Sequence, residues 1–192
     1  MGAFEMEING EAVAPENYFE PGFSMYRSSL YYTAYDVTDL VKQGANAIGA
    51  TLAAGWYTGF QSFTAENNYS LWGDYEALLA TLVLTYEDGT KGYVVTDPSW
   101  EGYKESPVRY ASMYQGERYD ARVNTDWMLP GYDASDWSNA KVNREFTGKL
   151  TVWDGEPVTV RQDLERVPQQ LYVYDSIEGA SSGCYGKVHI AR

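Results

Sequence analysis

Residues 4–13 read FEMEINGEAV, and this stretch decides the fold class. Phe4, Met6 and Ile8 alternate with two glutamates, which is the period of a strand with one buried face. Asn9-Gly10 follows, and this dipeptide tolerates the two positive φ values of a type I′ turn. The stretch therefore predicts a β-hairpin in which residues 11–13 form the returning strand.

A second hairpin is predicted further along the chain. Residues 77–86 (ALLATLVLTY) form the most apolar run, and residues 92–96 (GYVVT) follow the turn residues EDGT. Asp88-Gly89 marks the turn between the two strands. A continuous apolar strand needs cover on both of its faces, so residues 77–86 are expected to lie centrally in a sheet.

Short runs of strand-forming residues, separated by Gly, Asn, Asp and Pro, occupy the rest of the chain. They predict further strands at residues 29–35, 47–53, 107–114, 118–123, 149–153, 156–161, 170–174 and 185–190. Helical signals are confined to residues 36–44, with a capping aspartate and a final glycine, and to one turn at residues 133–137. Many short strands with frequent turn residues indicate an all-β fold, a jelly-roll β-sandwich.

The chain is expected to divide near residue 163. Residues 1–162 are predicted to form a β-sandwich domain, and residues 163–192 either its terminal strands or the start of a following domain. Residues 176–184, rich in Ser, Gly and Ala, are expected to form a flexible loop. The first residues have neither the basic nor the apolar region of a signal peptide, and the compartment stays unknown.

The charge and cysteine content argue against several classes of partner. The formal net charge of −13 disfavours nucleic acid and anionic lipid, because both require a basic surface. The chain has no apolar run of about 18 residues, so no membrane partner is expected. A single cysteine, Cys184, excludes an internal disulfide and a cysteine-based zinc site.

The sequence offers little for catalysis. Because His189 is the only histidine, a catalytic triad would have to use it. It sits in a predicted strand. No hydrolase, metalloprotease, dinucleotide-binding or phosphate-binding motif is present. A glycosidase needs only two carboxylates, but with 27 acidic residues their mere presence carries almost no weight.

Aromatic residues make up 16% of the chain and are densest between residues 55 and 75. Loops on a rigid sandwich commonly hold binding residues, and a Trp or Tyr face can stack on a sugar ring. The predicted carbohydrate-binding residues are three stacking faces, Trp56, Tyr57 and Trp72, and two polar ligands, Asn68 and Asp74. The alternative is that this loop folds over the sheet edge on its own tryptophans.

A second candidate wall lies between residues 114 and 122. Its members are Tyr114, Glu117, Tyr119, Asp120 and Arg122. A charge inside a sandwich needs a partner, so Arg122 is alternatively expected to form a buried pair with Asp120 or with a neighbouring carboxylate.

An ordered set of motifs over residues 5–140 resembles the bacterial α-L-rhamnosidase N-terminal domain. The motifs are Ile8-Asn9-Gly10, Pro21-Gly22-Phe23, the stretches 32–40 and 44–49, Gly55-Trp56-Tyr57-Thr58-Gly59, the stretches 72–80 and 86–89, Thr96-Asp97-Pro98-Ser99-Trp100, and the stretches 116–122 and 131–137. A fragment such as Tyr86-Glu87-Asp88-Gly89 is weak alone, whereas the collinear set is specific.

The resemblance implies a non-catalytic accessory module of a glycoside hydrolase, preceding an (α/α)₆ catalytic barrel that this chain does not contain. It implies two partners, a rhamnose-containing glycan and other domains of the same polypeptide. Some relatives bind rhamnose through Ca²⁺, and family members often read Thr-Asp-Tyr where this chain has Ser24-Met25-Tyr26. Met25 does not coordinate a hard cation, so Asp74 is the one candidate metal ligand. The alternative is a purely structural scaffold that packs against the barrel and binds no sugar.

Overall fold

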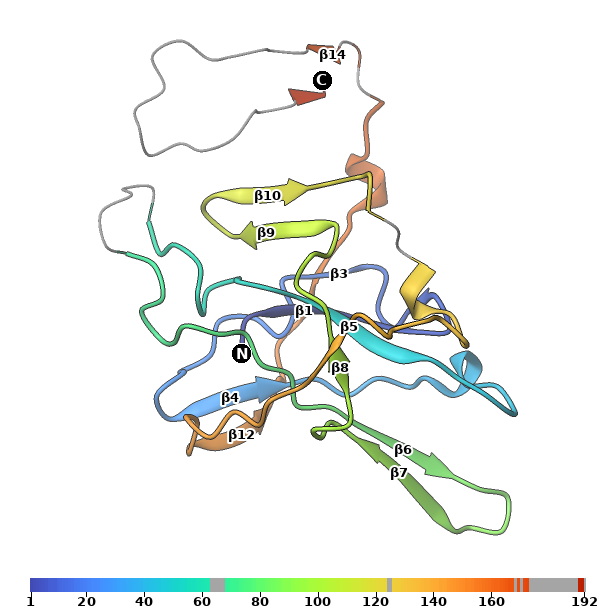
Figure 1. The fold of residues 1–192 in the computed structure, drawn as a ribbon. Helices are drawn as coiled ribbons and strands as arrows, with labels where there is room; N and C mark the ends of the chain where they lie inside the picture. Colours follow the sequence, from blue (N-terminus) through green and yellow to red (C-terminus); the bar gives the residue numbers. More distant parts are fainter. Residues whose placement is uncertain (63–67, 124–125, 168, 170, 173–189, 192) are drawn as a thin grey trace.

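All regular structure in the described residues is β-strand, apart from three short 3₁₀ turns (Figure 1). The computed structural model describes residues 1–62, 68–123, 126–167, 169, 171–172 and 190–191. The strands are β1 (Ala3–Ile8), β2 (Glu11–Ala12), β3 (Asn17–Tyr18), β4 (Ser29–Tyr32), β5 (Ile48–Ala53), β6 (Thr81–Thr85), β7 (Lys91–Val95), β8 (Glu101–Gly102), β9 (Val108–Ser112), β10 (Gly116–Tyr119), β11 (Ser138–Asn139), β12 (Lys149–Val152), β13 (Val158–Thr159), β14 (Leu171–Tyr172) and β15 (Ile190–Ala191). The 3₁₀ turns are η1 (Thr38–Leu40), η2 (Asp126–Met128) and η3 (Gln162–Leu164).

The first predicted hairpin is confirmed and forms the edge of a three-stranded antiparallel sheet, in the order β2-β1-β5. Ile8 of β1 faces Glu11 of β2, which leaves Asn9 and Gly10 as a two-residue turn. Their φ angles are 55° and 80°, as a type I′ turn requires. On its other edge β1 pairs with β5 along its whole length.

The buried side chain of Asn9 fixes the start of β5 against this turn. Its Nδ2 donates to the carbonyl of Leu40 at 2.9 Å and to Oδ1 of Asn46 at 2.8 Å, and its Oδ1 accepts from the amide of Ala47 at 3.0 Å. The amide of Asn9 donates to the carbonyl of Ala47 at 2.9 Å, which extends the β1–β5 ladder by one step. One side chain therefore joins the turn, the segment after η1 and the beginning of β5.

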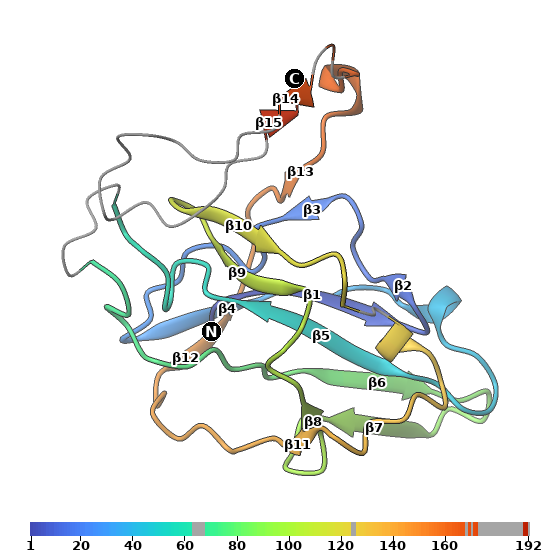
Figure 2. The same ribbon diagram turned by 45° about the horizontal axis from the view of Figure 1, so that its top comes forward.

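The β1–β2–β5 sheet is covered on both sides (Figures 1 and 2). The β9–β10 hairpin lies on one side of it, and the parallel pair β4–β12 lies on the other. Next to β9–β10, η2 packs directly on β5, where a Cβ at Gly49 would lie 2.9 Å from the Trp127 ring and 3.3 Å from the Met128 sulfur. Met128 is one of the buried apolar side chains of the described chain.

The second predicted hairpin is confirmed, but its predicted central position is wrong. β6 and β7 form a two-stranded sheet of their own and project from the rest of the domain at the lower right of Figure 1. Along β6 the side chains alternate between exposed and half-buried, so only one face is covered. Residues 77–80 precede the strand, and Ala77 instead exchanges hydrogen bonds with Met1. Two leucines of the strand face inward, whereas Val83 stays exposed on the other face. An apolar composition therefore did not mean that both faces are covered.

Most other predicted strands are confirmed with shorter bounds, as β4, β5, β9, β12 and β13. The strand predicted at 118–123 is wrong beyond Tyr119, because the chain turns at Asp120. The turn predicted within 36–44 is present as η1, and the turn predicted at 133–137 is present as one hydrogen-bonded turn, in which the Trp137 amide donates to the Ala134 carbonyl at 2.9 Å. Among the described residues the strands pair as one three-stranded and six two-stranded sheets, so the all-β class holds while the jelly-roll topology is not confirmed.

Several C-terminal predictions lie outside the described residues. These are the loop at 176–184, Cys184, His189 and most of the strands predicted at 170–174 and 185–190. Of those strands the structure describes β14, which pairs with β15. In the part of the chain that is described, no helix has the length and apolarity needed to cross a bilayer.

We expect Asn9→Ala to lower the free energy of unfolding by about 2–4 kcal/mol. Alanine is strained at a positive φ, and the substitution removes the side-chain partners of half-buried backbone groups at Leu40 and Ala47. Asn9→Gly keeps the turn and removes only the hydrogen bonds, so it should cost less. The measurement is urea denaturation, with the exposed Asn139→Ala as matched control; equal effects of Asn9→Ala and Asn139→Ala would contradict this account of the turn.

Candidate functional site

The residues predicted at 55–75 begin in a tight turn directly after β5. The carbonyl of Ala54 accepts from the amides of Tyr57 at 3.1 Å and Thr58 at 3.2 Å. Gly55 lies at φ 53°, and its amide donates to Ala111 of β9 at 3.1 Å. A Cβ at Gly55 would lie 2.8 Å from the amide nitrogen of Ala3, so glycine permits this close approach to β1. The β1–β5 register thus sets the place of Trp56 and Tyr57.

Six aromatic rings meet at this turn, and we call them the Trp56 cluster. Its members are Phe19, Phe23, Tyr26, Trp56, Tyr57 and Trp72. Phe23 lies between the two tryptophans, with ring centroids 6.4 Å from Trp56 and 6.3 Å from Trp72. Tyr26 joins Tyr57 at 5.1 Å and Trp72 at 5.8 Å. The structure therefore brings together all three predicted stacking residues.

The rings of the Trp56 cluster differ in their access to solvent. Tyr57 is only 3% exposed, so it packs inside the cluster and offers no free face. Arg27 lies over the Trp72 ring at 5.4 Å from its centroid and occupies that face. Trp56 is half-buried, and both of its ring neighbours meet it at steep angles of 62° and 87°. Phe19 and Phe23 are exposed beside it. The accessible part of the cluster is thus Trp56 with the two phenylalanines.

The two predicted polar ligands sit on the loop beyond the cluster. Asn68 is half-buried and donates from Nδ2 to the Ser62 hydroxyl at 2.9 Å, while its carbonyl accepts from the amide of Gln61 at 2.7 Å. Asp74 is exposed, next to Gly73, whose backbone lies so close to the Tyr57 phenol that any Cβ there would overlap it. Burial, with the charges of Glu145 and Asp74, raises the pKa of Tyr57.

A calcium ion near Asp74 finds few ligands in the described residues. No three histidine, cysteine, aspartate or glutamate side chains gather in that part of the chain to hold a metal. Ca²⁺ prefers six to eight oxygen ligands. The remaining oxygens would therefore have to come from amides, hydroxyls, backbone carbonyls, water or the sugar itself.

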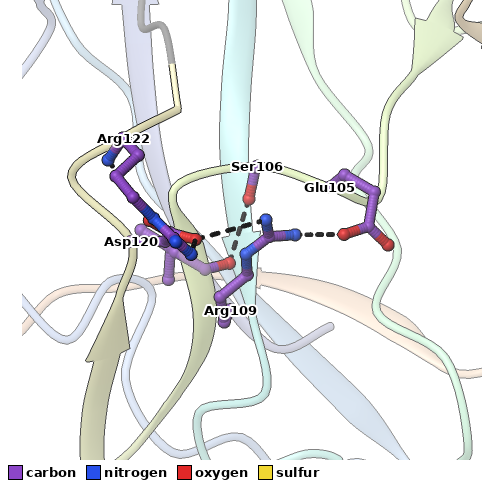
Figure 3. Close-up of polar contacts among 6 residues, drawn as sticks. Glu105, Ser106, Arg109, Asp120 and Arg122 are labelled. Atoms are coloured by element: carbon purple, nitrogen blue, oxygen red, sulfur yellow. Dashed lines mark hydrogen bonds and ion pairs between the residues drawn. The ribbon is translucent and has the colours of Figure 1, made fainter.

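Two residues of the second candidate wall, Asp120 and Arg122, belong to an ion-pair network at the base of β9–β10 (Figure 3). Arg122 binds both carboxylate oxygens of Asp120, each at 2.7 Å, and Arg109 reaches Asp120 at 3.7 Å and also pairs with Glu105. Hydrogen bonds from Arg122 hold the pKa of Asp120 well below its usual range. The predicted pairing of Arg122 with Asp120 is confirmed, but the Arg122 side chain is 89% exposed, so the pair is not buried.

Of that wall, Tyr119 also lines an open cleft of about 370 Å³ between β1, β9–β10 and η2. Glu5 and Glu7 share one face of β1 and line the same cleft, together with Trp127. Burial and the charge of Glu5 raise the pKa of Glu7. Tyr114 is half-buried, Glu117 is exposed, and neither lines the cleft.

The sequence did not indicate several residues of the Trp56 cluster and of the cleft. Phe19, Phe23 and Tyr26 precede β4 and reach the Trp56 cluster only through the fold, because they lie 30 or more residues from Trp56. Glu5 and Glu7 read as the solvent side of a strand, and nothing in the sequence placed Trp127 opposite them. A Phe at φ 60°, as found at Phe19, also has no local sequence signal.

Comparison with known proteins gives one consistent family. The family model of the α-L-rhamnosidase N-terminal domain matches residues 1–162. An α-L-rhamnosidase of Alteromonas sp. is 35% identical over 150 residues, covering 78% of this chain and 16% of that protein. An α-L-rhamnosidase of Streptomyces avermitilis is 38% identical over 166 residues, covering 85% of this chain and 16% of that protein.

Solved structures agree with the sequence relatives. The crystal structure of Streptomyces avermitilis α-L-rhamnosidase complexed with L-rhamnose matches with a TM-score of 0.77 and 31% identity, over 91% of this chain and 16% of that one. The α-L-rhamnosidase from Dictyoglumus thermophilum matches with a TM-score of 0.73 and 31% identity, over 90% of this chain and 18% of that one. The chain thus spans about a sixth of the length of the relatives it matches.

The buried phenol of Tyr26 makes the Trp56 cluster sensitive to alkaline pH. Burial raises the pKa of Tyr26 to about 12 from an ordinary value of 10.0. The folded chain therefore keeps a proton that the unfolded chain has lost, so stability is full below pH 10 and falls as pH rises toward 12. We expect Tyr26→Phe to reduce this fall in urea denaturation series, whereas Tyr93→Phe, at an exposed site, should not. An unchanged slope in Tyr26→Phe would contradict the burial of this phenol.

Proposed function

Because the chain belongs to the α-L-rhamnosidase N-terminal domain family, we propose that it is a non-catalytic accessory module that recognises rhamnose-containing glycans. Residues 1–162 would form this module, and residues 163–192 its terminal strands or the start of a following domain. One solved relative of the same family is a complex with L-rhamnose, which supports the choice of sugar.

The observation that carries the proposal is the accessible part of the Trp56 cluster. Aromatic faces stack on the C–H face of a sugar, and Phe19 and Phe23 extend the half-buried Trp56 into a broader apolar surface. Phe19 holds a φ of 60°, which costs a bulky side chain free energy and often marks a ligand site.

Polar groups near the cluster would bind the sugar hydroxyls. Asp74 is exposed and lies near enough to Tyr57 for its charge to act on that phenol, and Asn68 lies on the same loop. A calcium ion held by Asp74 and the sugar oxygens would add affinity without a preformed carboxylate cluster. Tyr57 supports the cluster from inside and is left out of the binding surface because it is buried.

A second candidate function is structural packing against other domains of the polypeptide, including the catalytic barrel. The observation that favours it is coverage, because the chain spans only 16% to 18% of its relatives. The two functions are compatible, since the Trp56 cluster occupies only part of the surface. A sugar-binding measurement distinguishes a chain that has both functions from a chain that has the structural function alone.

We expect Trp56→Ala to weaken L-rhamnose binding about tenfold, or about 1.4 kcal/mol, because an aromatic anchor is removed. The measurement is calorimetric titration of the chain with L-rhamnose, in calcium and in chelator, with folding checked by circular dichroism. Tyr119→Ala is the matched control and should bind like the unmodified chain. Loss in chelator and in Asp74→Asn together would assign a calcium ligand to Asp74.

Three outcomes would contradict this assignment. No binding in either buffer favours the structural function alone. Equal affinity of Trp56→Ala and the unmodified chain removes the Trp56 cluster from the site. A loss confined to Tyr119→Ala moves the sugar to the cleft of Glu5, Glu7 and Trp127.

We also expect the purified chain to show no turnover of an aryl α-L-rhamnoside. The motivating observation is that the chain matches the N-terminal domain of α-L-rhamnosidases and spans only about 16% of such a protein. The cleft lined by Glu5 and Glu7 gives the strictest test of this expectation. Glu7 has a raised pKa and lies beside a second carboxylate, Glu5, and such a pair suits a general acid. Turnover that disappears in Glu7→Gln would overturn the non-catalytic assignment.

A further inference from the structure

The β6–β7 hairpin carries an apolar face with no cover in the described chain. Val83 pairs directly with Tyr93, and Thr81 pairs with Val95, so these side chains share one face with Thr85 and Lys91. We call this the outer face of the hairpin. Val83 is 49% exposed, Tyr93 62% and Val95 46%, and the three lie next to one another across the two strands.

The opposite face of the hairpin is partly covered, and Val94 and Tyr86 on it are 39% and 53% exposed. Leu82 and Leu84 are half-buried there, and the Tyr86 ring lies over Gly92, where a Cβ would come within 2.8 Å of its hydroxyl. The two strands pair only with each other, and the hairpin projects from the domain in Figure 1. A two-stranded hairpin is marginal in water, and a contiguous exposed apolar face marks an interaction site.

We propose that the outer face docks against another domain of a longer α-L-rhamnosidase polypeptide, on an apolar surface with a basic rim. This rests on the structural part of the proposed function. Each relative has about five-sixths of its length outside the region that this chain matches. In a longer polypeptide, this remaining sequence is available to pack against the domain. The extra chain supplies the covering surface.

The charges around the outer face select the character of its partner. Glu87 and Asp88 lie at the tip of the hairpin and Asp97 at its base, against the single cation Lys91. Hydrogen bonds from Thr90 and Ser99 lower the pKa of Asp88 and Asp97 respectively, which keeps both charged. A second copy of this chain would bring like charges to this rim, with a net charge of −13 on each copy. A surface with lysine or arginine around an apolar centre fits better.

The test compares the 192-residue chain with a longer polypeptide that carries the same sequence and the catalytic part. Hydrogen–deuterium exchange of peptides covering residues 81–95 should be at least about tenfold slower in the longer polypeptide. Val83→Glu should abolish that slowing and leave exchange in the short chain unchanged. Val142→Glu, at a site 56% exposed outside the hairpin, is the matched control and should have no effect in either. Tyr93→Lys serves as a second variant if Val83→Glu folds poorly.

Three results would overturn the proposal. Equal exchange of residues 81–95 in both polypeptides means that no domain covers the face. Faster exchange of Val83→Glu in the short chain alone means that the face belongs to the fold of this domain. Dimerisation of the short chain that Val83→Glu abolishes, seen by light scattering, assigns the face to a second copy. L-rhamnose affinity is measured in parallel, so failure of the sugar proposal is read separately.

Discussion

The hydrogen bonds of the buried Asn9 side chain are the constraint on which the architecture depends. They hold a type I′ turn on one side and the start of β5 on the other, so β1 and β5 can pair in only one register. A one-residue slip would turn Phe4, Met6 and Ile8 to the wrong face. The same register delivers the end of β5 to the beginning of β1, where Gly55 makes its close approach to Ala3.

The Trp56 cluster is a consequence of that placement. The turn after β5 puts Trp56 and Tyr57 against Phe23 and Tyr26, which arrive from the segment before β4. Gly73 completes the contact, because its missing side chain leaves room for the Tyr57 phenol. The inner rings hold the cluster together, and the outer rings are free to meet a ligand. We therefore propose that structural support and sugar recognition belong to different members of one cluster.

Local signals predicted the elements well, and distant contacts explain what was missed. Asn9-Gly10 and Asp88-Gly89 define their hairpins through turn chemistry alone, and both are present. The prediction that residues 77–86 are covered on both faces was wrong, because composition does not separate such a strand from one that exposes Val83. For the site, the density of aromatic residues around Trp56 could be predicted from the sequence. The burial of Tyr57, the Arg27 side chain over Trp72 and the contribution of Phe19 and Phe23 come from tertiary contacts.

We propose two functions for separate surfaces of one all-β domain, sugar recognition at the Trp56 cluster and domain contact at β6–β7. The most direct test of the first is NMR of the indole N–H resonances of the six tryptophans during titration with L-rhamnose. We predict a saturable shift of Trp56, with Trp100 and Trp153 unchanged. Resonances that stay fixed at high sugar concentration, or a shift confined to Trp127 in the cleft, would contradict the account.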